Sequence, residues 1–311
     1  MIINGTEILP GEETKVSVNI ARLPSHTPID ITMTIARAVE PGPVLLLMGG
    51  LHGDEINGIE IVRRMVEQGH HRPLKGTVIC MPILNIYGFI HFSRYVPDGK
   101  DVNRSFPGNR NGSLASRVAN YMTRDILPNI DLGIDFHTGG ADRTNYPQIR
   151  ALLKNPINEE LARVFKAPFT IDSKFRSNSL RWMANKLGKN ILVYEGGESS
   201  RFDEYAIQLG LDGALRVMKH LGMVDDAPAA ELENRFIKGS FWIRAKASGL
   251  FQTAVASGDS VKKKQLVGYL TDPFGDFKVS VEAPFDGFVI GLNNNPLLHQ
   301  GDALMHIGRV K

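Results

Sequence analysis

Short, continuous apolar segments alternate with longer amphipathic segments over residues 44–221. The apolar segments suit buried strands and are 44–48, 77–81, 130–136 and 191–194. The amphipathic segments carry apolar residues three or four positions apart, as on one helix face; they are 55–68, 113–127, 158–165, 179–187 and 205–221. Apolar strands that alternate with helices are typical of a largely parallel sheet. We therefore predict an α/β domain here.

The segments on either side have the pattern of antiparallel strands. Polar and apolar side chains alternate over residues 1–40, which is the period of half-buried strands. Residues 224–230 have the composition of a linker, and after them the helical period disappears. Short strands with turn glycines and a repeated Gly-Asp pair then indicate an all-β module of two similar halves. We predict an α/β domain over residues 1–228 and a β-rich domain over residues 229–311.

Composition excludes several kinds of site and partner. The only cysteine, Cys80, rules out an internal disulfide and a cysteine-based zinc site. A net charge of +3 over 311 residues is no nucleic-acid footprint. The longest apolar stretch, 44–48, is too short to span a bilayer, and residues 1–7 lack a signal-peptide pattern. We expect a cytoplasmic protein without nucleic-acid or membrane partners, and any metal must be bound by histidines and carboxylates.

The first apolar strand leads through glycines to His52, and Glu55 begins the following helix. An imidazole and a carboxylate one turn apart can converge on one cation, and both suit zinc. On this segment alone, a loop histidine followed by a carboxylate that stabilises a helix N-terminus explains the residues equally well.

Two further predicted strands run into chemically active residues. The strand 130–136 leads to His137, the strand 191–194 leads to Glu195, and glycines follow both motifs. Carboxyl ends of parallel strands line one edge of a sheet, where ligands bind. Three protein ligands, His52, Glu55 and His137, would leave zinc an open position for water, and Glu195 could be the general base. A core histidine and a surface carboxylate are the alternatives.

Four segments together resemble the succinylglutamate desuccinylase/aspartoacylase family, within the zinc carboxypeptidase-like superfamily. They occur in the expected order, and as a set they are specific; they are 52–55, 101–108, 135–139 and 195–197. The resemblance implies a mixed sheet flanked by helices, as in zinc carboxypeptidases.

The same resemblance implies roles for individual residues. It implies one Zn²⁺ per chain, bound by His52, Glu55 and His137, with Glu195 as the catalytic carboxylate. It also implies that Arg94 polarises the scissile carbonyl and that a substrate carboxylate is held by Asn103 and Arg104. Asp135 either orients a ligand histidine or is a turn carboxylate. Four further residues stay outside the predicted site: Arg143, Tyr146, Arg176 and Arg181.

The C-terminal segment resembles the lipoyl/biotinyl-like barrel-sandwich module. The residue that corresponds to the modified lysine would be Lys278, but its neighbours Phe277 and Val279 are not methionines. We therefore predict no biotin or lipoyl attachment. We expect this domain to cover the rim of the site and restrict which substrates enter.

The sequence thus predicts a zinc-dependent hydrolase that removes an N-acyl group from an amino acid or a related small amine. A zinc carboxypeptidase acting on short peptides is the alternative within the superfamily. A non-catalytic protein that binds a metal or small ligand is the alternative of another class. The acyl group and the amine remain open, and so does assembly into a homo-oligomer.

Overall fold

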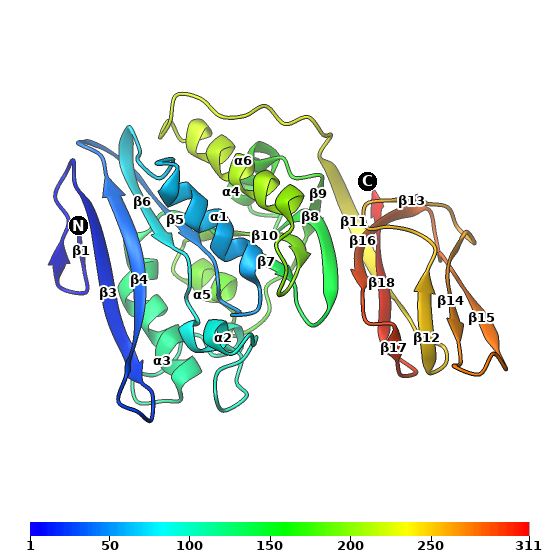
Figure 1. Cartoon of the computed structure of the whole chain (residues 1–311). Coiled ribbons are helices and arrows are strands. Elements are labelled where there is room, and N and C mark those ends of the chain that lie inside the picture. The colour runs from blue at the N-terminus through cyan, green and yellow to red at the C-terminus, as the bar shows by residue number, and fades with distance from the viewer. Residues whose placement is uncertain (311) are drawn as a thin grey trace.

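A mixed β-sheet with helices on both faces forms the larger part of the molecule in the computed structural model, which describes residues 1–310 (Figure 1). Its centre consists of adjacent parallel strands, in the order β10, β7, β5 and β6. These are β5 (Glu40–Met48), β6 (Lys75–Met81), β7 (Leu132–Gly139) and β10 (Asn190–Glu198). They are the four apolar strands that the sequence predicts, so the α/β prediction is confirmed.

The antiparallel strands expected before residue 40 lie at one edge of this sheet. Strand β3 (Glu13–Arg22) pairs antiparallel with β4 (Pro28–Arg37), which in turn pairs antiparallel with β6. A two-stranded hairpin, β1 (Ile2–Ile3) and β2 (Thr6–Glu7), precedes them.

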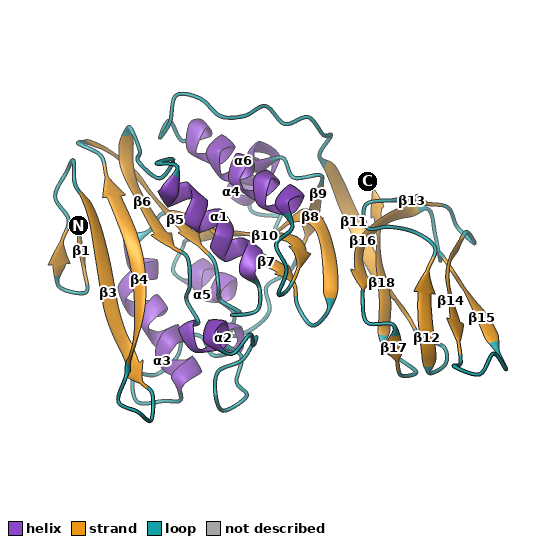
Figure 2. Cartoon of the chain, viewed as in Figure 1, coloured by secondary structure: helices purple, strands orange, loops and turns teal. Residues whose placement is uncertain are grey.

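Helices lie on both faces of the sheet (Figure 2). An apolar core lies between the sheet and the helices on each face. Along β5, Leu45 and Leu47 belong to one core, whereas Leu46 and Met48 belong to the other, because successive side chains of a strand point to opposite faces. The first core is covered by α1 (Ile56–Glu67), α4 (Pro156–Phe165) and α6 (Glu204–His220). The second is covered by α3 (Leu114–Tyr121) and α5 (Leu180–Lys186).

Every predicted helix is present, with one change of type. The predicted helix 113–127 begins after a Ser113 side chain that accepts from the amide of Ser116, as an N-cap does. It remains α-helical only to Tyr121, and a π turn (Met122–Ile126) and a 3₁₀ turn (Leu127–Asn129) follow. A short helix, α2 (Ile86–Ile90), and a 3₁₀ turn, η1 (Val102–Arg104), lie in the loop after β6.

Two strands of the larger domain escaped the sequence analysis. Strand β8 (Arg143–Ala151) pairs antiparallel with β10, and β9 (Phe169–Asp172) pairs parallel with β8. Strand β8 contains too many polar residues for an apolar strand pattern, and β9 is only four residues long.

The regular elements of residues 235–310 are all strands. They are β11 (Arg235–Arg244), β12 (Gly249–Thr253), β13 (Ser260–Val261), β14 (Leu266–Thr271), β15 (Lys278–Glu282), β16 (Gly287–Asn293), β17 (Leu297–Leu298) and β18 (Ala303–Val310). They form a separate four-stranded sheet, β15-β14-β12-β17, and an extension of the main sheet. One apolar core lies between the two groups of strands.

The main sheet continues through the predicted boundary between the domains. Residues 221–234, all described, contain neither helix nor strand, yet β11 pairs parallel with β9 directly after them. Strand β16 also pairs with β8, so the pairings close a ring in the order β8, β9, β11, β18, β16 and back to β8. Apolar side chains from both segments fill it, among them Phe169, Ile237 and Ile290. The segments before and after residues 221–234 are therefore joined by pairing between their strands.

None of the helices in residues 1–310 combines the length and the apolar character that crossing a membrane requires.

Candidate metal centre and active site

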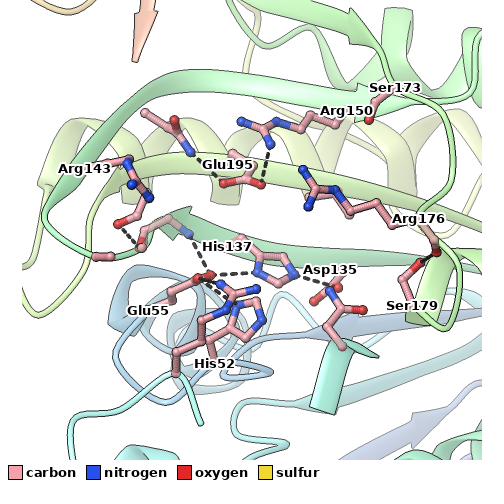
Figure 3. Close-up of a pocket in the computed structure, with 18 of the residues that line it drawn as sticks. His52, Glu55, Asp135, His137, Arg143, Arg150, Ser173, Arg176, Ser179 and Glu195 are labelled. Carbon is pink, nitrogen blue, oxygen red and sulfur yellow. Dashed lines mark hydrogen bonds and ion pairs between the residues drawn. The ribbon is translucent and has the colours of Figure 1, made fainter. Parts of the chain in front are cut away.

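The loop after β5 and the end of β7 bring two histidines and a glutamate together (Figure 3). His52, Glu55 and His137 are all buried, and one candidate ligand atom from each lies within 4.8 Å of the others. The tight path of the loop depends on Gly53, because an added Cβ there would lie 1.9 Å from the carbonyl carbon of Gly88. The structure thus brings together the three residues predicted as metal ligands.

The Glu55 carboxylate lies between the two imidazoles. Its Oε1 is 2.7 Å from His52 Nδ1, and its Oε2 is 2.7 Å from His137 Nδ1. Burial works to raise the pKa of Glu55, but the two neighbouring imidazoles outweigh it and hold this pKa well below its usual range. Glu55 therefore stays ionised, which is the form that binds a metal.

The second nitrogen of each imidazole faces another carboxylate. His137 Nε2 lies 2.8 Å from Asp135 Oδ2, and His52 Nε2 lies 3.4 Å from Asp101 Oδ1. Burial works to lower the pKa of His137, but Asp135 and Glu55 together raise it well above its usual value. Asp135 is thus a partner of His137. Of the two roles that the sequence allows for Asp135, this contact favours the one that orients a histidine over that of a turn carboxylate.

This donor set fits a zinc ion. The Nδ1 atoms of His52 and His137 and the Glu55 carboxylate converge, while the outer carboxylate of Asp135 orients the ring of His137, as is usual around metal-bound histidines. Among residues 1–310, His52 Nε2 is buried and has no hydrogen-bond partner. Two histidines and a glutamate are a known ligand set of catalytic zinc.

Glu195 lies on β10 directly opposite His137 of β7 in the parallel register. The Asn145 side chain donates a hydrogen bond of 2.7 Å from Nδ2 to Glu195 Oε2. The Arg150 guanidinium is 3.3 Å from Glu195 Oε1. Both partners come from β8, so the strand missed by the sequence analysis holds this carboxylate.

The three predicted substrate-handling residues come from the loop before α3. Arg94 forms an ion pair of 2.8 Å with Asp101 and one of 3.3 Å with Glu55, which places its guanidinium beside the histidine–glutamate cluster. Asn103 and Arg104 lie in η1, and Asn103 Oδ1 accepts a 2.9 Å hydrogen bond from the amide of Leu180. The side-chain oxygen of Asn103 is therefore bound to Leu180, the first residue of α5.

A cavity of about 390 Å³ joins these groups, and all seven predicted site residues line it. Six further charged residues line it, outside the site that the sequence predicts: Asp135, Arg143, Arg150, Lys174, Arg176 and Arg181. Trp242, on β11 of the C-terminal segment, also lines the cavity and stacks on His306 at a ring-centroid distance of 4.5 Å. Tyr146 is not among the lining residues; its ring packs against Phe169.

A local signal exists for only some of these additional residues. The polar run in β8, which includes Arg143, Asn145 and Arg150, interrupts a series of apolar strands and marks a strand next to a polar cavity. Trp242 has no such signal, because its position depends on the pairing of β11 with β9.

Comparison with known proteins agrees with this arrangement. Residues 41–221 match the model of the succinylglutamate desuccinylase/aspartoacylase catalytic domain, and the chain belongs to this family. A curated relative is N-alpha-acetyl-L-2,4-diaminobutyric acid deacetylase from Halomonas elongata. It is 28% identical over 306 residues, a match covering 90% of this chain and 86% of the relative.

Solved structures share the fold over nearly the whole chain. The product-bound ectoine utilization protein EutE (DoeB) from Ruegeria pomeroyi has a TM-score of 0.85 at 23% identity, covering 96% of this chain and 97% of its own. A succinylglutamate desuccinylase/aspartoacylase from Rhodobacter sphaeroides has a TM-score of 0.85 at 23% identity, covering 98% of each chain. The resemblance therefore includes the C-terminal β strands.

Proposed function

We propose that this protein is a zinc-dependent hydrolase that removes an N-acyl group from an amino acid or a related small amine. The observation that carries the proposal is the buried cluster of His52, Glu55 and His137, which shares one cavity with Glu195. The name of the Halomonas elongata relative, a deacetylase of an N-acetylated amino acid, supports the same reaction class.

The side chains divide the work of amide hydrolysis between them. His52, Glu55 and His137 would hold the metal; zinc at such a site acts as a Lewis acid and makes water more acidic. Glu195 takes a proton from the attacking water as the new carbon–oxygen bond forms. It returns this proton to the amine nitrogen as the carbon–nitrogen bond breaks. The guanidinium of Arg94 stabilises negative charge that develops on the carbonyl oxygen.

The charge of the cavity favours a substrate that carries a carboxylate. Six arginines and a lysine line the cavity, against the three acids Glu55, Asp135 and Glu195. All three acids already have histidine, arginine or asparagine partners. Burial lowers the pKa of Arg104, and the positive charges of Arg176 and Arg94 lower it further. Asp101 acts in the opposite direction, but the pKa stays below its usual value. A substrate carboxylate would relieve this repulsion, and we assign its binding to Asn103 and Arg104.

The C-terminal segment favours a small substrate over a peptide. Trp242 forms part of the cavity wall, and Arg143 lies with its guanidinium carbon 5.8 Å from the centroid of the Trp242 ring. A peptidase needs a groove along which the chain can continue beyond the scissile bond. A site bounded by Trp242 suits an acylated amino acid, so we place the carboxypeptidase alternative second.

A turnover screen tests the proposal. The purified protein, loaded with Zn²⁺, is assayed against N-acetyl and N-succinyl amino acids and short peptides, with chelator-treated protein as the blank. We expect hydrolysis of one or more N-acyl amino acids, its loss after chelation, and its return with Zn²⁺. Release of C-terminal amino acids from peptides alone would favour the carboxypeptidase alternative. Stoichiometric metal binding without turnover of any substrate would favour the non-catalytic one.

A further inference from the structure

We propose that Asn145 is a positioning residue for Glu195, and that the C-terminal strand β16 holds Asn145 in place. The inference rests on the proposed function, because it assumes that Glu195 transfers the proton during hydrolysis. It gives the C-terminal β segment a part in catalysis that is separate from covering the cavity.

The contacts of the Glu195 carboxylate are asymmetric. Asn145 donates a 2.7 Å hydrogen bond to Oε2, whereas the Arg150 guanidinium lies 3.3 Å from Oε1. Asn145 is 6% exposed, so water offers little substitute for its amide. A carboxylate fixed at one oxygen cannot rotate freely, and proton transfer requires its other oxygen to keep its direction. Asn145 is thus the closest group that sets the orientation of Glu195.

Strand β16 approaches β8 at Asn145 itself. In the antiparallel register, Gly291 of β16 lies opposite Asn145. A Cβ added to Gly291 would lie 3.0 Å from Asn145 Oδ1 and 3.3 Å from the carbonyl oxygen of Thr144. These distances are shorter than ordinary van der Waals contact, so the absence of a side chain at Gly291 makes room for the Asn145 amide.

Side-chain hydrogen bonds hold this register on both sides of Gly291. The buried Gln148 donates a 3.0 Å hydrogen bond from Nε2 to the carbonyl oxygen of Ile290. After Gly291, Asn294 Nδ2 donates a 2.7 Å hydrogen bond to Thr144 Oγ1. Strand β16 is therefore fastened to β8 around the position where it meets Asn145. A contact chain runs from Gly291 through Asn145 to Glu195.

The first test is the variant Asn145→Ala, which removes the donor to Glu195. We expect kcat to fall by about 10- to 100-fold, as misplacement of a reacting group does. KM and the zinc content should stay within about twofold, because the side-chain hydrogen bond that Asn145 donates goes to Glu195 and not to a proposed metal ligand, Asn103 or Arg104. A kcat equal to that of the wild type would overturn the role of Asn145. A loss of zinc or a rise of KM alone would also overturn it, since Asn145 would then act elsewhere.

The second test is a double-mutant cycle with Gly291→Ala. This substitution should lower kcat severalfold in the wild type and have little further effect in the Asn145→Ala background, because its effect passes through Asn145. Gly239→Ala is the matched control: Gly239 lies on β11 of the same segment, and nothing lies within 4 Å of its added Cβ. We expect this control to leave kcat unchanged.

The outcomes of the cycle are distinct. If Gly291→Ala leaves kcat unchanged, or lowers it by the same factor in both backgrounds, the role of β16 is wrong. If Gly291→Ala does not fold, a second variant, Asn294→Ala, removes the hydrogen bond from the end of β16 to Thr144 beside Asn145 and enters the cycle in its place. A wild type inactive on every N-acyl amino acid would refute the proposed function itself, and with it this role; an active wild type with a fully active Asn145→Ala would refute the positioning role alone.

Discussion

The two sides of the cavity are assembled in different ways. On one side, His52, Glu55 and His137 contact one another directly and come from the ends of the adjacent strands β5 and β7. On the other side, Glu195 of β10 contacts Asn145 and Arg150, which both come from the neighbouring strand β8. Strand β8 in turn pairs with β16, almost 150 residues further along the chain.

Under the proposed function, this difference separates metal binding from proton transfer. The metal side depends on short local motifs and on the central sheet. The Glu195 side depends on a ring of strands that the C-terminal segment completes. Changes on the metal side should therefore alter zinc content, whereas changes on the Glu195 side should alter kcat or KM while the zinc stays bound.

The largest expected effect is that of His52→Ala. This variant removes one of three protein ligands, so we expect it to lose the metal and to lose turnover by several orders of magnitude. Elemental analysis gives the zinc content per chain. His299→Ala, at an exposed histidine of the C-terminal segment, is the control and should keep its zinc. An unchanged zinc content in His52→Ala would contradict the proposed centre.

A smaller effect on the same side is expected from Asp135→Asn. Asp135 lies 2.8 Å from His137 Nε2, and loss of such an outer partner usually weakens metal affinity by about 10- to 100-fold. Competition with a chelator of known affinity measures the change. Wild-type zinc affinity in this variant would mean that Asp135 does not orient His137.

A modest effect is expected on the other side from Trp242→Ala. Trp242 lines the cavity from the C-terminal segment, and loss of an apolar contact with the substrate raises KM by about 10-fold. Steady-state kinetics should show that kcat changes less than KM and that the zinc content does not change. Wild-type KM and kcat would indicate that this wall does not touch the substrate.

The sequence identifies the three residues that the structure brings together, His52, Glu55 and His137, because their signals are local. The continuous apolar strands identify the sheet, and His52, Glu55 and His137 follow directly from the places where those strands end. The alternating residues of β3 and β4 are equally local features, and the antiparallel strands that they predict are present.

The Glu195 side could be predicted only in part, because its contacts join segments that lie far apart in the chain. Glu195 itself directly follows the apolar run of β10, but Asn145 and Arg150 lie on a strand whose polar residues at the cavity hide its pattern. The register that brings Gly291 beside Asn145, and Trp242 to the cavity, joins segments far apart in the chain. No short sequence window contains that information.

The central claim is that Glu195 transfers protons at a site whose metal is held by other residues. The variant Glu195→Gln tests it most directly, because it keeps the size of the side chain and removes its ability to take a proton. Zinc content and turnover of an N-acyl amino acid are measured on the same preparation. We predict that zinc is retained at the wild-type level while turnover falls by several orders of magnitude. Near-normal turnover with zinc bound would contradict the account.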